Sequence, residues 1–206
     1  MKKKHFIDSH KVATAFAVLG MMFWTGNLDN TTAWVYFGLH GAYGMLWMLK
    51  STLFGDRQWD QPTSLWYGIV IWIALTGYWI APYLILTTDF EVPAWFLGAA
   101  IFVFTIGVFF HFTADMQKHI SLKLKPDHLI QEGVWGRTRN PNYFGELLIY
   151  LGFTCLAWHW LPVLWLTVMI AAEWIPNMIK KDKSLSRYEG FAAYKKRSKL
   201  IIPFIL

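Results

Sequence analysis

The sequence predicts an all-α integral membrane protein, a polytopic helical bundle of about six transmembrane helices with both termini in the cytoplasm. Three observations support this: an apolar and aromatic composition, clustering of the apolar residues, and the placement of the basic ones. Of 206 residues, 55% are hydrophobic, including 13 Trp, 16 Phe and 9 Tyr. This is more apolar than a soluble domain of that size, and the length fits one transmembrane domain, residues 1–206.

The apolar residues fall into stretches that carry almost no charge. These stretches are residues 12–28, 32–53, 65–87, 93–114, 143–158 and 161–179. A spanning helix needs about 17–25 such residues, so the first four are long enough to cross a bilayer. The last two are short and are separated only by His159 and Trp160. We therefore expect them to form a tight helical hairpin.

The basic residues fix the expected orientation. In a six-helix arrangement all 19 Lys and Arg fall on one side, with Lys11 placed before the first span, and the loops 25–31, 88–92 and 159–160 carry none. Loops rich in Lys and Arg stay in the cytoplasm, which places both termini there. The membrane would be the inner membrane of a bacterial cell or the endoplasmic reticulum of a eukaryotic one. A basic face suits anionic lipid or a phosphorylated cofactor, whereas cations divided among membrane-tied loops argue against nucleic acid.

Three acidic residues lie in or near the predicted membrane: Asp115, Glu146 and Glu173. A carboxylate in hydrocarbon costs at least ~2.5 kcal/mol, so it usually faces a cavity or a partner. All three belong to the cytoplasmic half, where residues 115–147 and 177–206 also gather charge, Pro and Gly. We expect any chemical site there, although hydrogen bonding between helices would explain the same residues.

Residues 133–146 contain a helix start. Pro141 fits the first turn of a helix, and Asn140 is then the expected N-cap. The free N–H groups at such an end, together with Arg137 and Arg139, predict an anion site. A plain cap with cytoplasmic anchors is the alternative.

Residues 139–146, Arg-Asn-Pro-Asn-Tyr-Phe-Gly-Glu, resemble a signature that two related groups of membrane enzymes carry as Arg-His-Pro-x-Tyr-x-Gly. One group comprises the steroid 5-alpha-reductases and the sterol C14/C7 reductases, which use NADPH. The other comprises the isoprenylcysteine and phospholipid methyltransferases, which use S-adenosylmethionine. Asn140 stands where His is usual. That departure counts more against the methyltransferases, in which the His helps to hold the cofactor.

Two further stretches resemble the reductases. Residues 114–118, Ala-Asp-Met-Gln-Lys, are similar to a motif that precedes the signature in sterol reductases. Residues 183–194 and 199–204 are similar to the C-terminus of the steroid 5-alpha-reductase domain. The paired Glu residues usual in the methyltransferases are absent from this region. The resemblance covers residues 110–206, which we interpret as a reductase-like, cofactor-binding part.

The resemblance implies an NADPH-dependent oxidoreductase acting on CH–CH groups, of the 3-oxo-5-alpha-steroid 4-dehydrogenase type. A hydride would pass to the conjugated double bond of a lipophilic enone, such as a steroid or isoprenoid. Glu146 would lie near the nicotinamide as a catalytic residue. The residues implied to hold the cofactor are Asp115, Lys118, Arg137, Asn142, Tyr143, Arg187 and Tyr188.

The carbonyl of such a substrate needs a proton donor. The resemblance points to Tyr43, which has His40 one helical turn away, because a steroid 5-alpha-reductase places its catalytic Tyr on a comparable helix. There a cofactor-binding Arg follows fourteen residues later, as Arg57 does here. The partner Glu of those enzymes has no counterpart, since the first two predicted helices hold no acid, so Glu146 or Glu173 would substitute. A packed aromatic role for Tyr43 is the alternative.

Two other functions stay open. One is an S-adenosylmethionine-dependent methyltransferase of a membrane lipid or a prenylated thiol, and the other is a non-catalytic membrane protein that binds lipid or a partner. The seven His residues show no metal-ligand spacing, so no metal is expected. No Rossmann or P-loop glycine pattern is present, and any nucleotide would be bound by the membrane fold itself.

Overall fold

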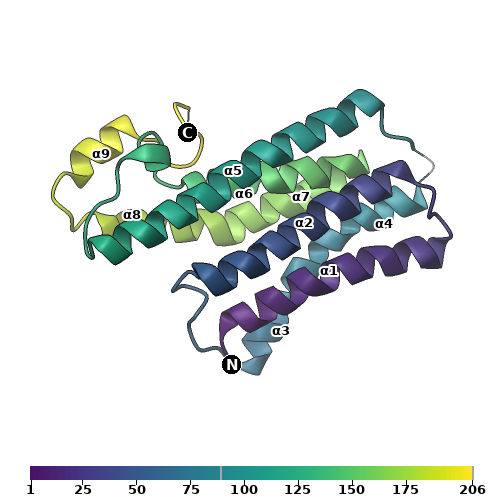
Figure 1. Ribbon diagram of the computed structural model, residues 1–206, viewed down its shortest axis with the longest axis horizontal. Helices are drawn as coiled ribbons and strands as arrows, with labels where there is room; N and C mark the ends of the chain where they lie inside the picture. The colour runs from purple at the N-terminus through teal and green to yellow at the C-terminus, as the bar shows by residue number, and fades with distance from the viewer. Residues whose placement is uncertain (89, 206) are drawn as a thin grey trace. The chain divides into compact units, whose positions relative to one another are not determined.

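The computed structural model describes residues 1–88 and 90–205; Asp89, in the predicted loop 88–92, lies outside them. The described part is 75% helical and has no strand, so the all-α prediction is confirmed. Figure 1 shows the helices in chain order. The elements are α1 (Lys3–Thr25), α2 (Thr31–Leu53), α3 (Leu65–Thr76), η1 (Gly77–Trp79), α4 (Ile80–Thr87), α5 (Ala94–Leu124), η2 (Gly133–Trp135), α6 (Pro141–Thr154), η3 (Cys155–Ala157), α7 (Trp160–Met169), η4 (Ile170–Trp174), α8 (Ile175–Leu185) and α9 (Phe191–Arg197).

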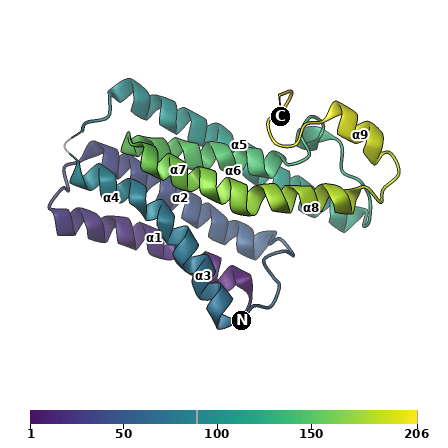
Figure 2. The same cartoon turned by 180° about the vertical axis from the view of Figure 1, so that it is seen from behind.

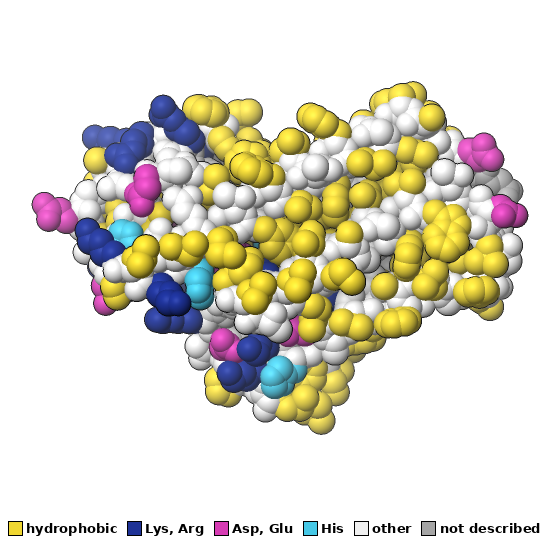
Figure 3. Space-filling model, in the orientation of Figure 1, with side chains coloured by type: hydrophobic (Ala, Val, Ile, Leu, Met, Phe, Trp, Pro, Cys, Tyr) yellow, Lys and Arg dark blue, Asp and Glu magenta, His cyan; other side chains and the backbone are white. Residues whose placement is uncertain are grey.

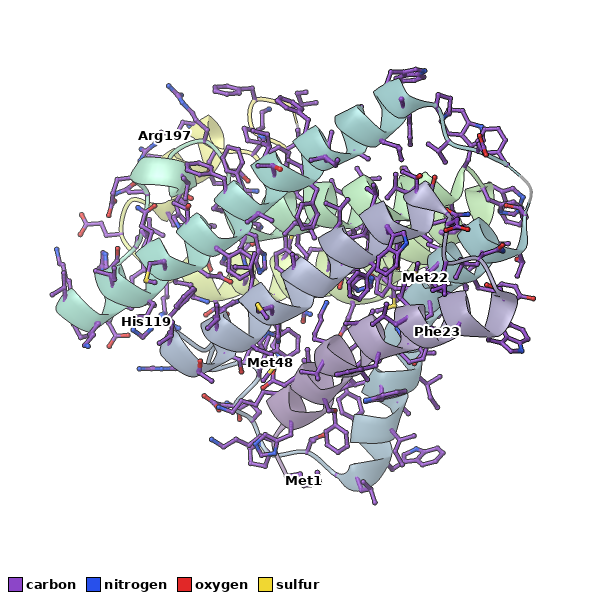
Figure 4. The ribbon with its side chains drawn as sticks, turned by 45° about the vertical axis from the view of Figure 1, so that its right-hand side comes forward. Met1, Met22, Phe23, Met48, His119 and Arg197 are labelled. Carbon is purple, nitrogen blue, oxygen red and sulfur yellow. The ribbon has the colours of Figure 1, made fainter. Side chains whose placement is uncertain are left out.

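Within residues 1–88 and 90–205, four helical segments are long and apolar enough to cross a membrane, which indicates an integral membrane protein. They are Lys3–Thr25, Leu65–Thr87, Ala94–Leu124 and Trp160–Leu185. Their outward faces are apolar: on α1, Met22 is fully buried while the next residue, Phe23, is 69% exposed, and both are labelled in Figure 4. The second and fifth predicted spans are helical as α2 and α6, but they are not among these four, so the total of six spans stays a prediction.

The chain divides into two compact units. Unit 1 comprises Met1–Phe104 and Ile149–Leu166, and unit 2 comprises Thr105–Leu148 and Thr167–Leu206. Three elements, α5, α6 and α7, contribute residues to both units. The signature residues and the C-terminal segment therefore belong to unit 2, whereas the first two helices belong to unit 1.

In unit 1, α1 lies along α2, and α3 and α4 pack against α1 (Figures 1 and 2). α1 and α2 approach closely at Gly44, where a Cβ would lie 2.8 Å from the backbone oxygen of Lys11. At the far end of these helices, the Asn27 side chain donates to the carbonyl of Leu86 at 2.7 Å and thereby ties the α1–α2 loop to the end of α4. A glycine at the crossing and an amide at the loop thus fix the pairing of α1 with its neighbours.

The start of α1 differs from the prediction. The helix begins at Lys3, nine residues earlier than expected, because the 57–63 loop captures its first turn: Lys3 N donates to Gln61 O at 3.1 Å and Lys4 N to Trp59 O at 2.9 Å. Lys11 therefore lies inside α1 and is buried, rather than preceding the first span. The expectation that the first two helices hold no acid was also wrong, because α1 includes Asp8.

The third predicted span is a helix that is interrupted by a 3-10 turn, so α3, η1 and α4 follow one another directly. Pro82 has no N–H, so it cannot donate to the carbonyl of Tyr78, and the helix changes to a 3-10 turn (η1) just before this point. The Tyr36 hydroxyl from α2 donates to that carbonyl at 3.1 Å and lies 2.8 Å from His40 Nδ1. Because a hydroxyl has one hydrogen, His40 Nδ1 is then the donor to the Tyr36 oxygen.

The last predicted span also has a break, a π-helical segment, η4, between α7 and α8. Pro176 follows it, and the N–H of Ile175 reaches back to the Ile170 carbonyl, one residue further than in an α-helix. The predicted hairpin turn is found at Trp158 and His159, with Trp158 in the left-handed region at φ 47°.

Candidate functional site

The first turn of α6 presents a buried oxygen that lacks a hydrogen-bond donor. Asn140 precedes Pro141, and the Phe144 N–H donates to the Asn140 carbonyl at 3.0 Å, so the helix begins where the sequence predicted. Asn142 is the second residue of α6, and its Oδ1 is buried with no hydrogen-bond partner among the described residues. A buried amide oxygen without a donor costs about 1–3 kcal/mol, which a bound ligand bearing N–H or O–H groups would recover.

A buried histidine and carboxylate from α5 stand beside this turn. His111 Nδ1 lies 3.0 Å from the Asn142 carbonyl oxygen, which can only accept, so Nδ1 is the donor. His111 Nε2 lies 3.8 Å from Asp115 Oδ2, one turn further along α5, and both side chains are at most 5% exposed. Asp115, His111 and Asn142 thus form a continuous polar track between α5 and α6.

Gly145, in the signature, permits this approach. A Cβ there would lie 2.2 Å from the backbone N of His111 and 2.7 Å from the Gly107 carbonyl oxygen, closer than any side chain can come. Only glycine lets the two helix backbones pack this closely. Gly145 therefore positions His111 against the Asn142 backbone and has no need of a chemical role.

The two motifs recognised in the sequence meet in the loop before α6. Gln117 donates to the Glu132 carbonyl at 2.9 Å and accepts from the Val134 N–H at 3.3 Å. Trp135 Nε1 donates to the Ala114 carbonyl at 3.2 Å. Residues 114–118 thus hold the loop that leads into the signature.

Arg139, one of the two cations of the predicted anion site, pairs with other residues of the chain. Its Nε lies 3.0 Å from both carboxylate oxygens of Asp182, its Nη1 donates to the Ser198 carbonyl at 2.7 Å, and the residue is only 6% exposed. The Asn140 side chain likewise donates to the Leu200 carbonyl at 2.9 Å and accepts from Lys181 at 3.0 Å. Both side chains are occupied in tying the C-terminal segment to the loop before α6.

That segment is ordered and anchored. Lys199 pairs with Thr138 in a parallel bridge, since Arg139 N donates to Lys199 O at 2.8 Å and Lys199 N donates to Arg137 O at 3.0 Å. The Tyr194 hydroxyl donates to the Trp135 carbonyl at 2.7 Å. Burial raises the pKa of this phenol to about 12, so it stays protonated throughout the physiological range.

Three other predicted cofactor-binding cations belong to unit 2. Arg137 and Arg187 are exposed; Arg137 lies 5.7 Å from the Phe204 ring, and Arg187 donates to the Tyr188 hydroxyl at 2.9 Å. Lys118 is half-buried. Figure 3 shows Lys and Arg side chains gathered over the end of unit 2 that carries α9 and the last turns of α5, where Figure 4 labels Arg197 and His119.

Unit 2 holds eight of the ten predicted site residues. On α6, Glu146 lies one turn after Asn142 and is half-buried, and the Tyr143 ring lies 5.6 Å from Trp174 of the π segment. The eight are Asp115, Lys118, Arg137, Asn142, Tyr143, Glu146, Arg187 and Tyr188.

The other two predicted residues, Tyr43 and Arg57, belong to unit 1. Tyr43 is fully buried, and Arg57 is exposed on the loop between α2 and α3. Sequence reasoning missed His111 as a neighbour of the signature, because it lies 31 residues before Asn142 and the His residues were considered only as metal ligands. Within the described residues, no group of three or more His, Cys, Asp or Glu is arranged to hold a metal ion.

The family model of a group of proteins of unknown function, DUF1295, matches residues 57–198. The chain belongs to the DUF1295 family. That family includes steroid 5-alpha-reductase-like proteins. The matched residues span both predicted motifs and the loop that Gln117 holds. No curated protein matches the chain.

Proposed function

We propose that this protein is a membrane-embedded, NADPH-dependent reductase of a carbon–carbon double bond in a lipophilic enone. The observation that carries the proposal is the buried, donor-less Oδ1 of Asn142, a residue whose backbone carbonyl contacts His111 of the His111–Asp115 pair, in the same unit as a cationic surface. Ribose hydroxyls and the nicotinamide amide are donors that suit such acceptors, and phosphates suit the cations. Dinucleotides present both kinds of group in one ligand.

The cations favour NADPH over S-adenosylmethionine. Arg137, Arg187 and Lys118 are all on unit 2, and guanidinium groups bind phosphate through paired N–H donors. S-adenosylmethionine has no phosphate, carries a positive sulfonium and offers these cations only one carboxylate, so it matches a cationic surface less well. The methyltransferase is therefore the second candidate, and a non-catalytic lipid-binding protein is the third.

The proposed topology has six spans with both termini in the cytoplasm. It is supported by the one-sided placement of Lys and Arg and by the contacts of the N-terminus, where Lys2 and Lys4 lie 3.1 Å and 2.9 Å from Asp60 Oδ1. A single cysteine at position 2 or 88, in a Cys155→Ser background, tests it with a membrane-impermeant thiol reagent. Labelling of position 2 from the outside of intact cells would reject this orientation.

Cofactor binding is the experiment that tests the function. In mild detergent we expect NADPH to raise the thermal midpoint, since a ligand at a hundred times its dissociation constant adds about 2.7 kcal/mol. We expect NADH to act less strongly, because the 2′-phosphate needs the cations, and S-adenosylmethionine to have no effect. Stabilisation by S-adenosylmethionine alone would establish the methyltransferase instead.

Two variants locate the cofactor. Asn142→Ala and Arg137→Ala should weaken NADPH stabilisation while leaving the unliganded midpoint close to that of the wild type. Lys196→Ala, which removes an exposed cation on α9, is the matched control and should bind normally. Equal NADPH affinity in all three variants would reject this assignment.

We assign Glu146 a role in the catalytic step rather than in cofactor binding. Glu146→Gln keeps the shape and removes the charge, so we expect turnover of an enone to fall more than NADPH binding does. If Glu146→Gln instead lowers the thermal midpoint of the unliganded protein, Glu146 has a structural role.

A further inference from the structure

The C-terminal part of unit 2 presents a dense group of exposed cations, in and just after α9. Figure 3 shows Lys and Arg side chains gathered over this end of unit 2. Lys195 Nζ lies 3.9 Å from the Asp182 carboxylate, and within the described residues no ion pair engages the other cations of the group. The group consists of four exposed side chains within five residues, those of Lys195, Lys196, Arg197 and Lys199.

The backbone that carries these cations is held in place by buried neighbours. Tyr194, just before the group, is buried and donates through its hydroxyl to the Trp135 carbonyl at 2.7 Å. Ser198, within the group, is only 2% exposed, and its carbonyl accepts from Arg139 at 2.7 Å. A fixed backbone presents the cations in one arrangement, so binding to an anionic surface orders less chain than it would in a mobile basic tail.

The cations lie at the depth of the lipid headgroups. A helix rises 1.5 Å per residue, so a hydrocarbon core of ~30 Å contains about twenty residues of a spanning helix. Counted from Trp160, where the last candidate span begins, these residues end at Lys180, and Leu185 lies about 7 Å further along the axis. Leu185 packs against the buried cluster that includes Phe191 and Tyr194 of α9. α9 is therefore attached to the part of the span that passes through the headgroups.

Two large apolar side chains are exposed close to the cations. Phe204 is 73% exposed and Ile205 is 76% exposed. The Phe204 ring centroid lies 5.7 Å from Arg137 Cζ, and the Arg137 carbonyl accepts from the Lys199 N–H at 3.0 Å. Apolar side chains next to cations are typical of surfaces that enter a membrane interface, where the apolar groups reach the acyl chains and the cations bind phosphate.

We propose that residues 195–205 form a surface that binds the anionic lipid headgroups of the adjacent leaflet, with Phe204 and Ile205 inserted at the acyl boundary. Charge complementarity identifies the occupant, because the group has four cations and one of them lies near a carboxylate. A soluble polyanion would match the cations but leave the two apolar side chains in water. The surface does not depend on the proposed reductase, because it uses none of the cations assigned to the cofactor.

A fluorescent label next to Phe204 tests the surface. Ile205→Cys in a Cys155→Ser background is labelled, and the full chain is placed in nanodiscs of phosphatidylcholine, alone or with about one quarter phosphatidylglycerol. Lipids that carry a spin label near the headgroup quench a fluorophore in the interface. We expect strong quenching in the anionic discs and weak quenching in the neutral ones. The difference should disappear at ~1 M salt, where the Debye length is about 3 Å.

Charge variants measure the contribution of the cations. Each Lys or Arg near an anionic surface contributes about fivefold to its binding. Lys195→Gln with Lys196→Gln should therefore weaken the binding of phosphatidylglycerol by about 25-fold, and quenching should then no longer depend on the anionic lipid. Lys195→Arg with Lys196→Arg keeps both charges and should quench as the wild type does. The matched control is Lys123→Gln with Lys125→Gln, which removes two exposed cations near the end of α5 and should have little effect.

Three results would overturn the proposal. The first is equal quenching in neutral and anionic discs, and the second is an equal loss of quenching in the control variant. The third is a loss of quenching with inorganic phosphate that exceeds the loss with chloride at the same ionic strength, because the cations would then form a phosphate site. The label reads lipid contact and not cofactor, so failure of NADPH to stabilise the protein leaves this result unchanged.

Discussion

The two units satisfy buried polar groups in different ways. Between the helices of unit 1, polar side chains mostly bind one another: Lys11 donates to Tyr150, and His10 lies 3.3 Å from the Thr76 hydroxyl. Between distant segments of unit 2, polar side chains mostly bind backbone carbonyls: Arg139 binds that of Ser198, and Asn140 that of Leu200. The difference follows from the backbone, because a helix satisfies its own carbonyls whereas an irregular segment leaves them available.

The exceptions between the helices of unit 1 support this account, and one is the bond from Asn27 to the carbonyl of Leu86 in the last turn of α4. Tyr36 donates to the carbonyl of Tyr78, and that carbonyl is available only because Pro82 cannot donate to it. Between helices, polar side chains thus bind the backbone where the helical hydrogen-bond ladder ends or is interrupted. Variants that break these two kinds of contact should therefore lose different amounts of stability.

The largest effect is expected in unit 2, at Arg139. Arg139→Met leaves the Asp182 carboxylate, only 12% exposed, without its main cationic partner, and breaking such a pair costs about 3–5 kcal/mol. The thermal midpoint should fall sharply. The control is Lys183→Met, which changes an exposed residue on α8, the helix that carries Asp182, and should have little effect.

The double variant Arg139→Met with Asp182→Leu sharpens this point. It removes both charges, so it should regain part of the lost stability. If Arg139→Met alone is as stable as the wild type, the Arg139–Asp182 pair does not hold the C-terminal segment.

The next largest loss of stability is expected where two helices pack closely at a glycine, which occurs in both units. Gly145→Ala places a Cβ 2.2 Å from the backbone of His111, and Gly44→Ala places one 2.8 Å from that of Lys11. Overpacking costs about 1–3 kcal/mol, and we expect Gly145→Ala to cost more, because its clash is closer. Gly38→Ala and Gly98→Ala meet nothing within 4 Å and should be neutral or stabilising. The reverse order in unfolding experiments would contradict this ranking.

The smallest effect is expected at the exposed end of unit 1. Hydrogen bonds from Lys4 and then Lys2 lower the pKa of the Asp60 carboxyl below its usual 3.8. The folded state thus binds this proton less readily, so the contribution is present above pH 3.8 and disappears as the pH falls through the lowered pKa. Asp60→Asn should be slightly less stable than the wild type near pH 7, and the two midpoints should converge in strong acid. A gap that widened in acid would refute the assigned direction.

The positions of the helices followed from the sequence, because charge-free apolar runs mark helix interiors. The start of α1 did not, since its first turn depends on contacts with the loop 57–63, in which Gln61 lies 58 residues after Lys3 and Trp59 lies 55 residues after Lys4. The breaks at η1 and η4 could be inferred only as kinks at Pro82 and Pro176. The sequence does not show that one break is a 3-10 segment, beside which Tyr36 binds the Tyr78 carbonyl, and the other a π segment.

For the candidate site, the signature told where α6 begins but not which side chains stay available. Arg139 and Arg137 look equivalent in sequence, yet one is buried against Asp182 and the other is exposed. Nothing local distinguishes them, because Asp182 is 43 residues further along the chain. Lys11 looked like an anchoring charge because the aromatic rings that surround it, those of Tyr43, Trp47 and Tyr150, come from α2 and α6.

The tie between Arg139 and Asp182 also has a consequence for biosynthesis. At a synthesis rate of ~5–20 residues per second, the ribosome needs about 2–9 s to make the 43 residues that separate the two side chains. During that time Arg139 lacks its carboxylate partner, and in the proposed topology a lipid phosphate is the substitute that we expect. Membranes poor in anionic lipid should then slow the maturation of unit 2 while leaving the insertion of α1 and α2 unaffected.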